Sequence, residues 1–197
     1  MNNNKSTVII VSLFAIIVLL LGYFLSKNSP QGQGSQASAS TPSDLAGKPM
    51  PEIKLLDKNG RVYTLADFKG KTVVLFFNEG LMCYPACWNQ IAAFGGDPRF
   101  NNDEIQAISV VADSVGDWQR AIMQMPQLAK STTLFDVNTY ASRQLGMLTT
   151  ASSMHKGILP GHTYVLIDKN GIVRYVLDDP NMAIANDILF TKIGELK

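Results

Sequence analysis

The sequence predicts an α/β domain in which helices flank one central mixed sheet. Two continuous apolar runs, Thr72–Phe77 and Ile105–Val111, have the composition of strands that are covered on both faces. A helical pattern lies between them, which is typical of a βαβ unit. Residues 57–60 and 168–171 both end in Asn-Gly and predict hairpin turns near the two ends of the domain. Elements of this number and order favour a single hydrophobic core.

Local signals set the limits of the other elements. Pro85 suits the first position of a helix that runs through Phe94 and stops at Gly95. Pro126 ends an amphipathic helix over 115–125, and Gly146 ends another over 138–145. The remaining strands are expected at 52–56, 61–65, 132–135, 163–167 and 172–177, and the last helix at 183–196.

An uncharged apolar segment lies near the N-terminus. Residues 8–25 carry no charge, and Lys5 and Lys27 flank them. A segment of this length reaches the lower limit for a helix that spans a bilayer. The alternative is a cleaved signal peptide, but the nearest small-x-small triplet, at 37–39, lies far beyond the apolar segment. We therefore predict an uncleaved membrane anchor at 1–27.

The segment after the anchor separates it from the folded domain. Residues 28–43 have no charge and are rich in Ser, Gln and Gly, which predicts a flexible linker before a domain at 44–197. Lys5 and the α-amine give a weak positive-inside signal. A cysteine pair also fits an oxidising compartment. We expect a single-pass protein of the cell membrane whose domain faces the extracytoplasmic side.

The charge balance excludes some function classes. From Asp44 onward the chain holds 15 of its 17 Lys and Arg and all 16 Asp and Glu, because only Lys5 and Lys27 lie outside. A nearly neutral domain lacks the basic face that nucleic-acid binding needs. Neither a G-x-G-x-x-G motif nor a P-loop occurs, so no nucleotide cofactor is expected.

The candidate reactive residues lie in the motif C-Y-P-A-C. Its two cysteines, Cys83 and Cys87, are the only cysteines of the chain. They follow a central strand and open a helix, and strand ends of α/β sheets commonly carry active sites. The positive end of a helix dipole favours a thiolate, and we predict Cys83 as the nucleophile. Side chains four apart on a helix are too distant for a disulfide, so the pair closes only if Cys83 lies off the helix. The competing interpretation is two buried, inert cysteines.

Three stretches carry a family likeness. They are G-K-P-M-P-E-I-K-L-L-D-K-N-G-R-V-Y-T-L-A-D-F-K-G-K-T-V-V-L-F-F at 47–77, V-V-A-D at 110–113 with L-F-D-V-N-T-Y-A-S-R-Q-L-G-M at 134–147, and T-Y-V-L-I-D-K-N-G-I-V-R-Y at 163–175. They resemble the AhpC/TSA–redoxin group of thioredoxin-fold proteins over nearly all of 44–197. The resemblance implies a thioredoxin-like fold. The group includes peroxiredoxins, TlpA-type thiol reductases and, more distantly, Sco-type copper chaperones.

The chain departs from each branch at a specific position. Peroxiredoxins have a Thr that orients peroxide three residues before their reactive cysteine, where this chain has Gly80. TlpA-type reductases have C-x-x-C and a cis-Pro where this chain has His162. The C-x-x-x-C spacing with a nearby His is similar to the Sco type, although Tyr84 and Trp88 stand where Sco-type proteins have Pro. The resemblance implies that His162 faces Cys83 and Cys87, as proton carrier, thiolate partner or copper ligand.

Other candidates near the motif have less specific explanations. We expect His155 to lie in a solvated loop, Glu79 to be an exposed loop acid, and Trp88 to pack beside the site. Met82 and Met154 are possible thioether ligands, but core packing is the favoured explanation for both. Zinc is not expected, because two Cys and one well-placed His fall short of four ligands.

Two functions follow from these residues. The leading one is a membrane-anchored thiol-dependent oxidoreductase with Cys83, Cys87 and His162 as catalytic residues and no cofactor. Cys83 attacks a disulfide or, less efficiently, a peroxide; Cys87 resolves the product, and a membrane thiol donor resets the pair. The alternative is a Sco-like chaperone that holds copper through the same three residues and delivers it to a membrane oxidase.

Overall fold

The computed structural model describes residues 41–196. The predicted membrane anchor, at 1–27, lies outside these residues, as does the predicted linker up to residue 40. Within 41–196, none of the helices combines the length and apolar character needed to cross a bilayer. At the start of the described residues, Pro42–Leu45 form a 3₁₀ turn in which Pro42 and Leu45 are buried.

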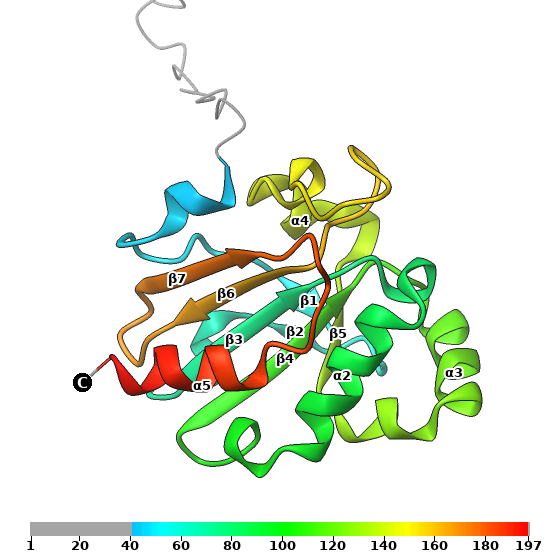
Figure 1. The fold of residues 1–197 in the computed structure, drawn as a ribbon, viewed down its shortest axis with the longest axis horizontal. Coiled ribbons are helices and arrows are strands. Elements are labelled where there is room, and N and C mark those ends of the chain that lie inside the picture. The colour runs from blue at the N-terminus through cyan, green and yellow to red at the C-terminus, as the bar shows by residue number, and fades with distance from the viewer. Residues whose placement is uncertain (1–40, 197) are drawn as a thin grey trace, which may run out of the picture. The chain divides into compact units, whose positions relative to one another are not determined.

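The described residues form one seven-stranded mixed sheet in the order β2-β1-β5-β4-β3-β6-β7 (Figure 1). β3, β4 and β5 run parallel, whereas β1, β2, β6 and β7 pair with their neighbours in antiparallel fashion. The strands are β1 Leu55–Leu56, β2 Val62–Tyr63, β3 Thr72–Phe77, β4 Ile105–Val111, β5 Thr133–Phe135, β6 Thr163–Ile167 and β7 Val173–Asp178. The predicted mixed sheet is confirmed.

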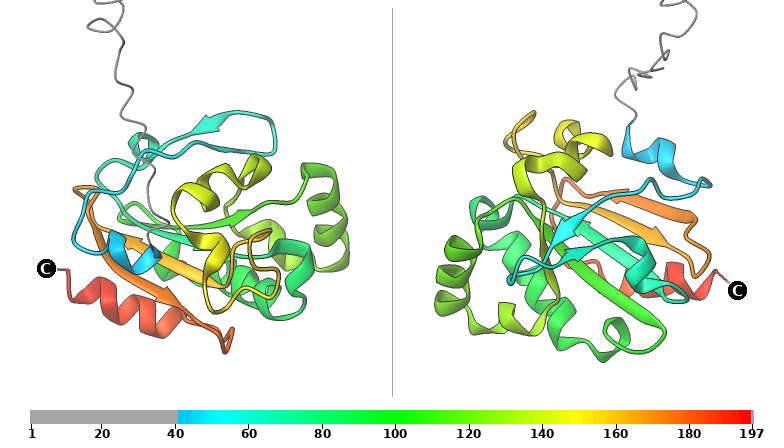
Figure 2. Two further views of the ribbon diagram at one scale, coloured as in Figure 1. Left: turned by 90° about the horizontal axis from the view of Figure 1, so that it is seen from above. Right: turned by 180° about the vertical axis from the view of Figure 1, so that it is seen from behind.

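Within residues 41–196, four α-helices accompany the sheet: α2 Ala86–Gly96, α3 Val115–Gln124, α4 Tyr140–Gln144 and α5 Asn186–Gly194. All six residues of β3 are buried, as its continuous apolar sequence predicts. Successive residues of a strand point to opposite faces, so Val74 and Phe76 join the core under α2 and α5, while Val73 and Leu75 join the core on the other face. Figure 2 shows α5 and the β1–β2 hairpin on opposite sides of the molecule.

The structure differs from the predicted elements mainly at edges and ends. The first hairpin has two residues in each strand, because Thr64 and Asp67 form a capping box that places Leu65–Phe68 in a 3₁₀ turn. α4 begins two residues later than predicted, because Asn138 and Thr139 adopt left-handed φ values of 56° and 55°. Such a conformation cannot continue a right-handed helix.

Strand pairing determines where the reactive motif lies. β3 and β6 are antiparallel neighbours, and Phe77 at the end of β3 is paired with Thr163 at the start of β6. The loop after β3 and the loop before β6 therefore meet at one edge of the sheet. This edge brings the cysteine motif and His162 together, although they are far apart in the sequence.

Candidate active site

Cys83 and Cys87 form a disulfide across a change of secondary structure. Cys83 ends the 3₁₀ turn Gly80–Cys83, and Cys87 is the second residue of α2. Their Cα atoms lie 5.3 Å apart, and their sulfurs are bonded. This confirms that the pair closes with Cys83 off the helix. Pro85 precedes the first residue of α2, one position earlier than predicted.

The disulfide is almost fully covered. The exposed fraction is 2% for Cys83 and 0% for Cys87. The Met182 sulfur lies 3.8 Å from the Cys83 sulfur, in a loop where Met182 has a left-handed φ of 51°. The Asp179 carboxylate holds this loop by accepting from the backbone N–H groups of Asn181 and Ala183. The Met182 side chain is therefore part of the cover over the Cys83 sulfur.

His162 lies directly against the cysteine pair, as the family resemblance implied. It is fully buried, its Nδ1 is 3.4 Å from the Cys87 sulfur, and its Nε2 is 2.7 Å from the Tyr164 hydroxyl oxygen. Burial lowers the pKa of His162 to about 4, against the smaller opposing effects of Asp179, the Ala183 backbone and Asp178. The imidazole is therefore neutral near pH 7. The two cysteine sulfurs and a His162 nitrogen all lie within 4.8 Å of one another.

Three polar side chains hold the turn that carries Cys83. The Asn78 amide oxygen accepts from the Gly80 N–H at 2.9 Å, and the Asp113 carboxylate accepts from the Leu81 N–H at 3.2 Å. The Trp88 indole donates to the Gly80 carbonyl at 3.1 Å. Trp88 therefore does more than pack beside the site as expected. Its hydrogen bond also links α2 to the turn.

Gly80 is required by this geometry. Its φ is 55°, and a Cβ built on it would overlap the Asp113 carboxylate. A Thr at this position, as in the peroxiredoxin pattern, is therefore incompatible with Asp113 as it lies here. Burial raises the pKa of Asp113 to about 6, which reflects how closely the turn covers this carboxyl group.

The predictions for Glu79 and His155 were wrong. Glu79 is 2% exposed and accepts from the N–H groups of Met154 and His155 at 2.6 and 2.9 Å. The His155 Nδ1 and the Ser153 hydroxyl lie 2.9 and 3.2 Å from the same carboxylate. A buried carboxylate needs such partners, so Glu79 fastens the loop before β6 to the loop that carries the cysteines. His155 is a partly covered member of this contact rather than a solvated loop residue.

The methionine predictions also need correction. Met82 and Met154 are both 57% exposed, so neither is part of the core. The methionine that contacts the cysteine pair is Met182, which the sequence did not single out. Its position depends on the loop between β7 and α5, and no short-range pattern reports the path of such a loop.

Two further residues of the site, Tyr164 and Gln90, were not predicted, although their spacing from His162 and Cys87 indicated their positions. Tyr164 lies on β6, two residues beyond His162, which directly precedes the strand. The strand period of two places both side chains on the same face, where they meet. Gln90 is three residues beyond Cys87 on α2, which places them on one face of the helix. The Tyr164 hydroxyl and the Gln90 amide oxygen lie 3.0 Å apart.

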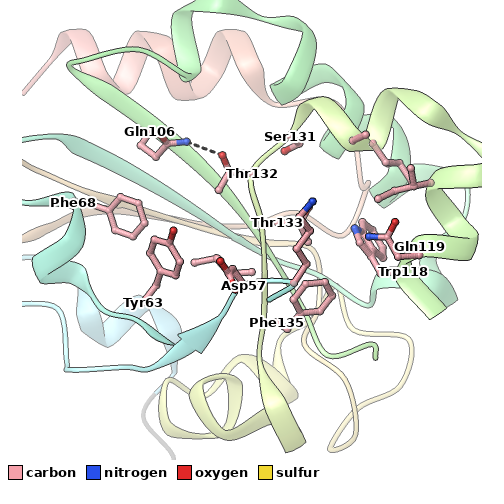
Figure 3. A pocket seen from close by; sticks show the side chains of 15 residues that line it. Asp57, Tyr63, Phe68, Gln106, Trp118, Gln119, Ser131, Thr132, Thr133 and Phe135 are labelled. Carbon is pink, nitrogen blue, oxygen red and sulfur yellow. Dashed lines mark hydrogen bonds between the residues drawn. The ribbon is translucent and has the colours of Figure 1, made fainter. Parts of the chain in front are cut away.

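A pocket of about 490 Å³ lies elsewhere, between the first hairpin, β5 and α3 (Figure 3). Tyr63, Phe68, Gln106, Trp118 and Phe135 are among its lining residues. Neither cysteine lines it, and neither does His162. The cysteine pair and His162 therefore lie outside this pocket.

Replacement of Met182 tests whether it controls access to Cys83. In the Met182→Ala variant, we expect dithiothreitol to reduce the disulfide several-fold faster, because the side chain over the Cys83 sulfur is removed. The Met82→Ala variant is the matched control, since Met82 is already exposed. Equal reduction rates in wild type and Met182→Ala would contradict the covering role.

The depressed pKa of His162 predicts a specific pH dependence. The pKa of His162 is about 4 in the folded chain and 6.5 in the unfolded chain. Between these pH values the unfolded chain binds more protons than the folded chain. The contribution of His162 to the free energy of unfolding is therefore complete above pH 6.5 and is lost as the pH falls to about 4. The loss amounts to about 3 kcal/mol. Asp113 acts in the opposite direction, because its raised pKa removes stability as the pH rises through about 6.

Urea unfolding of the oxidised domain at pH 7 and pH 4.5 measures this effect. The measurement uses Asp113→Asn as the background, with and without His162→Gln, so that the Asp113 contribution cancels. The free energy of unfolding should fall more at pH 4.5 in the protein that retains His162. The same pH dependence in both proteins would show that His162 is not desolvated.

Comparison with known proteins places this geometry in a family. Residues 46–176 match the model of the AhpC/TSA family. A putative chloroplastic peroxiredoxin Q of Oryza sativa subsp. indica is 27% identical over 134 residues, which cover 68% of this chain and 58% of the relative. The chloroplastic peroxiredoxin Q of Sedum lineare is 29% identical, with 68% of each chain covered. The chain thus spans little more than half the length of the rice relative.

Solved structures with similar folds include peroxiredoxins and a thioredoxin. The mitochondrial 2-Cys peroxiredoxin from Plasmodium falciparum has a TM-score of 0.61 and 22% identity, covering 77% of this chain and 94% of that chain. The pneumococcal exposed lipoprotein thioredoxin from Streptococcus pneumoniae has a TM-score of 0.56 and 20% identity, covering 74% and 100%. These similarities confirm the expected fold. Because the family model matches more than half of its residues, the chain belongs to the AhpC/TSA family.

Proposed function

We propose that this protein is a thiol-dependent oxidoreductase in which Cys83 reacts with the substrate and Cys87 resolves the product. The observation that carries this proposal is the Cys83–Cys87 disulfide, formed between a turn and the first turn of α2 beside a neutral histidine. Membership of the AhpC/TSA family supports it, as does the similarity to relatives named peroxiredoxin Q.

The proposed reaction cycle consists of attack by Cys83, resolution by Cys87 and reduction by a thiol donor. The Cys83 thiolate attacks one sulfur of a disulfide substrate, forms a mixed disulfide and releases a thiolate. With a hydroperoxide, it instead takes one oxygen to become a sulfenic acid and releases an alcohol or water. Cys87 then attacks the Cys83 sulfur, which closes the internal disulfide and expels the second thiol or water. A thiol donor supplies the two electrons that reopen the pair.

The assignment of roles rests on access and electrostatics. The Cys83 sulfur contacts the Met182 thioether in the loop after β7, while Cys87 is fully enclosed beside His162. A substrate therefore meets Cys83 first. Cys87 occupies the first turn of α2, where the helix dipole stabilises the thiolate that leaves when the internal disulfide is reduced.

The turn geometry favours disulfide substrates over peroxides. The peroxiredoxin pattern places a hydroxyl near the reactive cysteine, and this chain has Gly80 at that position. A Cβ there would collide with Asp113, so the hydroxyl has no equivalent at this backbone position. We therefore propose thiol–disulfide exchange as the main reaction and peroxide reduction as a slower one.

The proposed cellular setting follows from the N-terminal sequence. The uncharged segment 8–25 would anchor the protein in the cell membrane, with the redox domain on the extracytoplasmic side. A membrane thiol carrier is then the proposed electron donor, because the domain would have no access to cytoplasmic reductants. Oxidising conditions on that side are compatible with a closed Cys83–Cys87 pair.

A second candidate function is copper delivery. Cys83, Cys87 and His162 converge within 4.8 Å, and soft sulfur with imidazole suits copper. The Met182 sulfur beside Cys83 adds a thioether to the donor set. The two cysteines would first have to be reduced, since their sulfurs are bonded to each other here. Copper delivery is the Sco-like alternative function that the sequence left open.

Turnover of the reduced domain distinguishes the candidates. With dithiothreitol as electron donor and insulin or hydrogen peroxide as substrate, wild type should turn over and Cys83→Ser should lose turnover entirely. Cys87→Ser should still react once with substrate, because Cys83 forms the first bond, and then stall. Unchanged turnover in Cys83→Ser would overturn the oxidoreductase proposal.

The same preparations test the copper alternative. Reduced domain that shows no turnover, yet binds Cu(I) one-to-one against a competing chelator, would favour a copper carrier. That binding should then disappear in His162→Ala. Binding no tighter than that of a small dithiol would instead support thiol chemistry alone.

A further inference from the structure

A continuous chain of buried hydrogen bonds leads away from the cysteine pair. It runs from Cys87 through His162 and Tyr164 to Gln90 and Asn186. These residues come from α2, from β6 and the position just before it, and from the start of α5. All five residues are buried. Each link has a direction, because each donor needs an acceptor, and the directions can be assigned from the far end of the chain.

The orientation of Asn186 is fixed by two acceptors. Its Nδ2 lies 3.2 Å from the Ala93 carbonyl and 3.0 Å from the Asp97 carboxylate. Arg99 hydrogen-bonds Asp97 and holds the pKa of that carboxyl at about 2, so Asp97 is ionised and can only accept. The Asn186 amide nitrogen must therefore face these groups. Its Oδ1 then accepts from the Gln90 Nε2 at 2.9 Å.

The orientation of Gln90 follows independently from a backbone donor. The Ala185 N–H points at the Gln90 Oε1 over 2.7 Å, and an N–H facing the amide nitrogen at this distance would be repulsive. The Gln90 Oε1 also lies 3.0 Å from the Tyr164 hydroxyl. Since this oxygen can only accept, the single hydroxyl hydrogen of Tyr164 is directed at it. Burial raises the pKa of Tyr164 well above its usual range, so that hydrogen remains in place.

Tyr164 therefore has no hydrogen left for His162. The 2.7 Å contact between the Tyr164 oxygen and the His162 Nε2 requires the hydrogen to come from the imidazole. A neutral imidazole carries one N–H. With that hydrogen on Nε2, the Nδ1 lone pair faces the Cys87 sulfur at 3.4 Å.

We infer that Tyr164, held by Gln90 and Asn186, is a positioning residue that keeps His162 in the Nε2–H tautomer, so that Nδ1 accepts the proton of the Cys87 thiol. This inference rests on the proposed function and assigns the base for its second step. Cys87 loses its proton to Nδ1 and attacks the Cys83 sulfur. The proton then leaves with the expelled thiolate as a thiol, or with the expelled hydroxide as water.

Other polar groups near His162 do not replace this arrangement. Asp178 and Asp179 act on the imidazole by charge, and the Ala183 backbone also favours its protonated form. Asp178 accepts from the N–H groups of Ala151 and Ser152, and Asp179 accepts from those of Asn181 and Ala183. Among the side-chain hydrogen bonds of residues 41–196, none joins either carboxylate to the His162 ring, whereas the Tyr164 hydroxyl oxygen lies 2.7 Å from Nε2. We therefore assign the ring hydrogen from the Tyr164 contact.

Two variants should move the tautomer in different ways. Tyr164→Phe removes the acceptor for Nε2–H while it keeps the ring that stacks on Phe76. Gln90→Met removes the acceptor of the Tyr164 hydroxyl, which frees that hydrogen to donate to His162 Nε2. The first variant should mix the tautomers, and the second should favour Nδ1–H. Tyr175→Phe, on the neighbouring strand β7, is the matched control.

Long-range ¹H–¹⁵N NMR of reduced, ¹⁵N-histidine-labelled protein reads the tautomer without any turnover. Wild type and Tyr175→Phe should show a protonated Nε2 and an unprotonated Nδ1. Stopped-flow measurement then separates the two chemical steps. In Tyr164→Phe and Gln90→Met, closure of the internal disulfide should slow by about tenfold or more, and reaction of Cys83 with substrate should be unchanged.

A wild-type Nδ1–H tautomer would overturn the inference, and so would closure rates that equal wild type in both variants. Loss of the first step in these variants would also overturn it, because the effect would then be structural. Failure of wild-type Cys83 to react with any disulfide or peroxide would instead overturn the proposed function. The NMR result distinguishes that failure from an incorrect tautomer assignment.

Discussion

The antiparallel pairing of β3 with β6 sets the position of every group in the site. Its register places Phe76 opposite Tyr164 and Phe77 opposite Thr163. His162 and Tyr164 then point to the face covered by α2, where Cys87 lies. A slip of one residue would turn both side chains to the opposite face of the sheet. The long apolar sequence of β3, buried along its whole length, resists such a slip, so core packing and active-site geometry depend on the same pairing.

Burial gives the site its chemical character. The ring centroids of His162 and Phe76 lie 4.6 Å apart, and desolvation of His162 keeps its imidazole neutral near pH 7. A buried polar group without a partner costs about 1–3 kcal/mol, and the chain from His162 to Asn186 avoids that cost by pairing each member. The same chain gives the hydrogen bonds a direction. An apolar environment and a connected polar network therefore act together to produce a neutral, oriented base beside a thiol.

The sequence predicted most of the fold because its central strands are continuous apolar runs. The limits of β3, β4 and β6 were predicted correctly, since such runs leave little choice of structure. The edge strands β1 and β2 were predicted too long, because a capping box competes with the ladder there. Edges and helix ends depend on single hydrogen bonds that the apolar pattern does not report.

The site was predictable where a motif or a period marked it. Cys83 and Cys87 follow from their spacing, and His162 follows from the family resemblance. Tyr164 follows His162 at the strand period, and Gln90 follows Cys87 at the helix period. Only the packed structure shows that the polar atoms of Tyr164 and Gln90 meet. Glu79 and Met182 gave no local signal, because their contacts come from loops distant in sequence. Tertiary contacts alone decide the roles of such residues.

The central claim is that Cys83 reacts first and Cys87 is the enclosed partner beside His162. The most direct measurement is alkylation of the reduced domain by iodoacetamide over a range of pH, with peptide mass spectrometry to quantify each cysteine separately. The structure predicts that Cys83 is alkylated first, while Cys87 is protected until the domain unfolds. Alkylation of Cys87 before Cys83 would contradict the account.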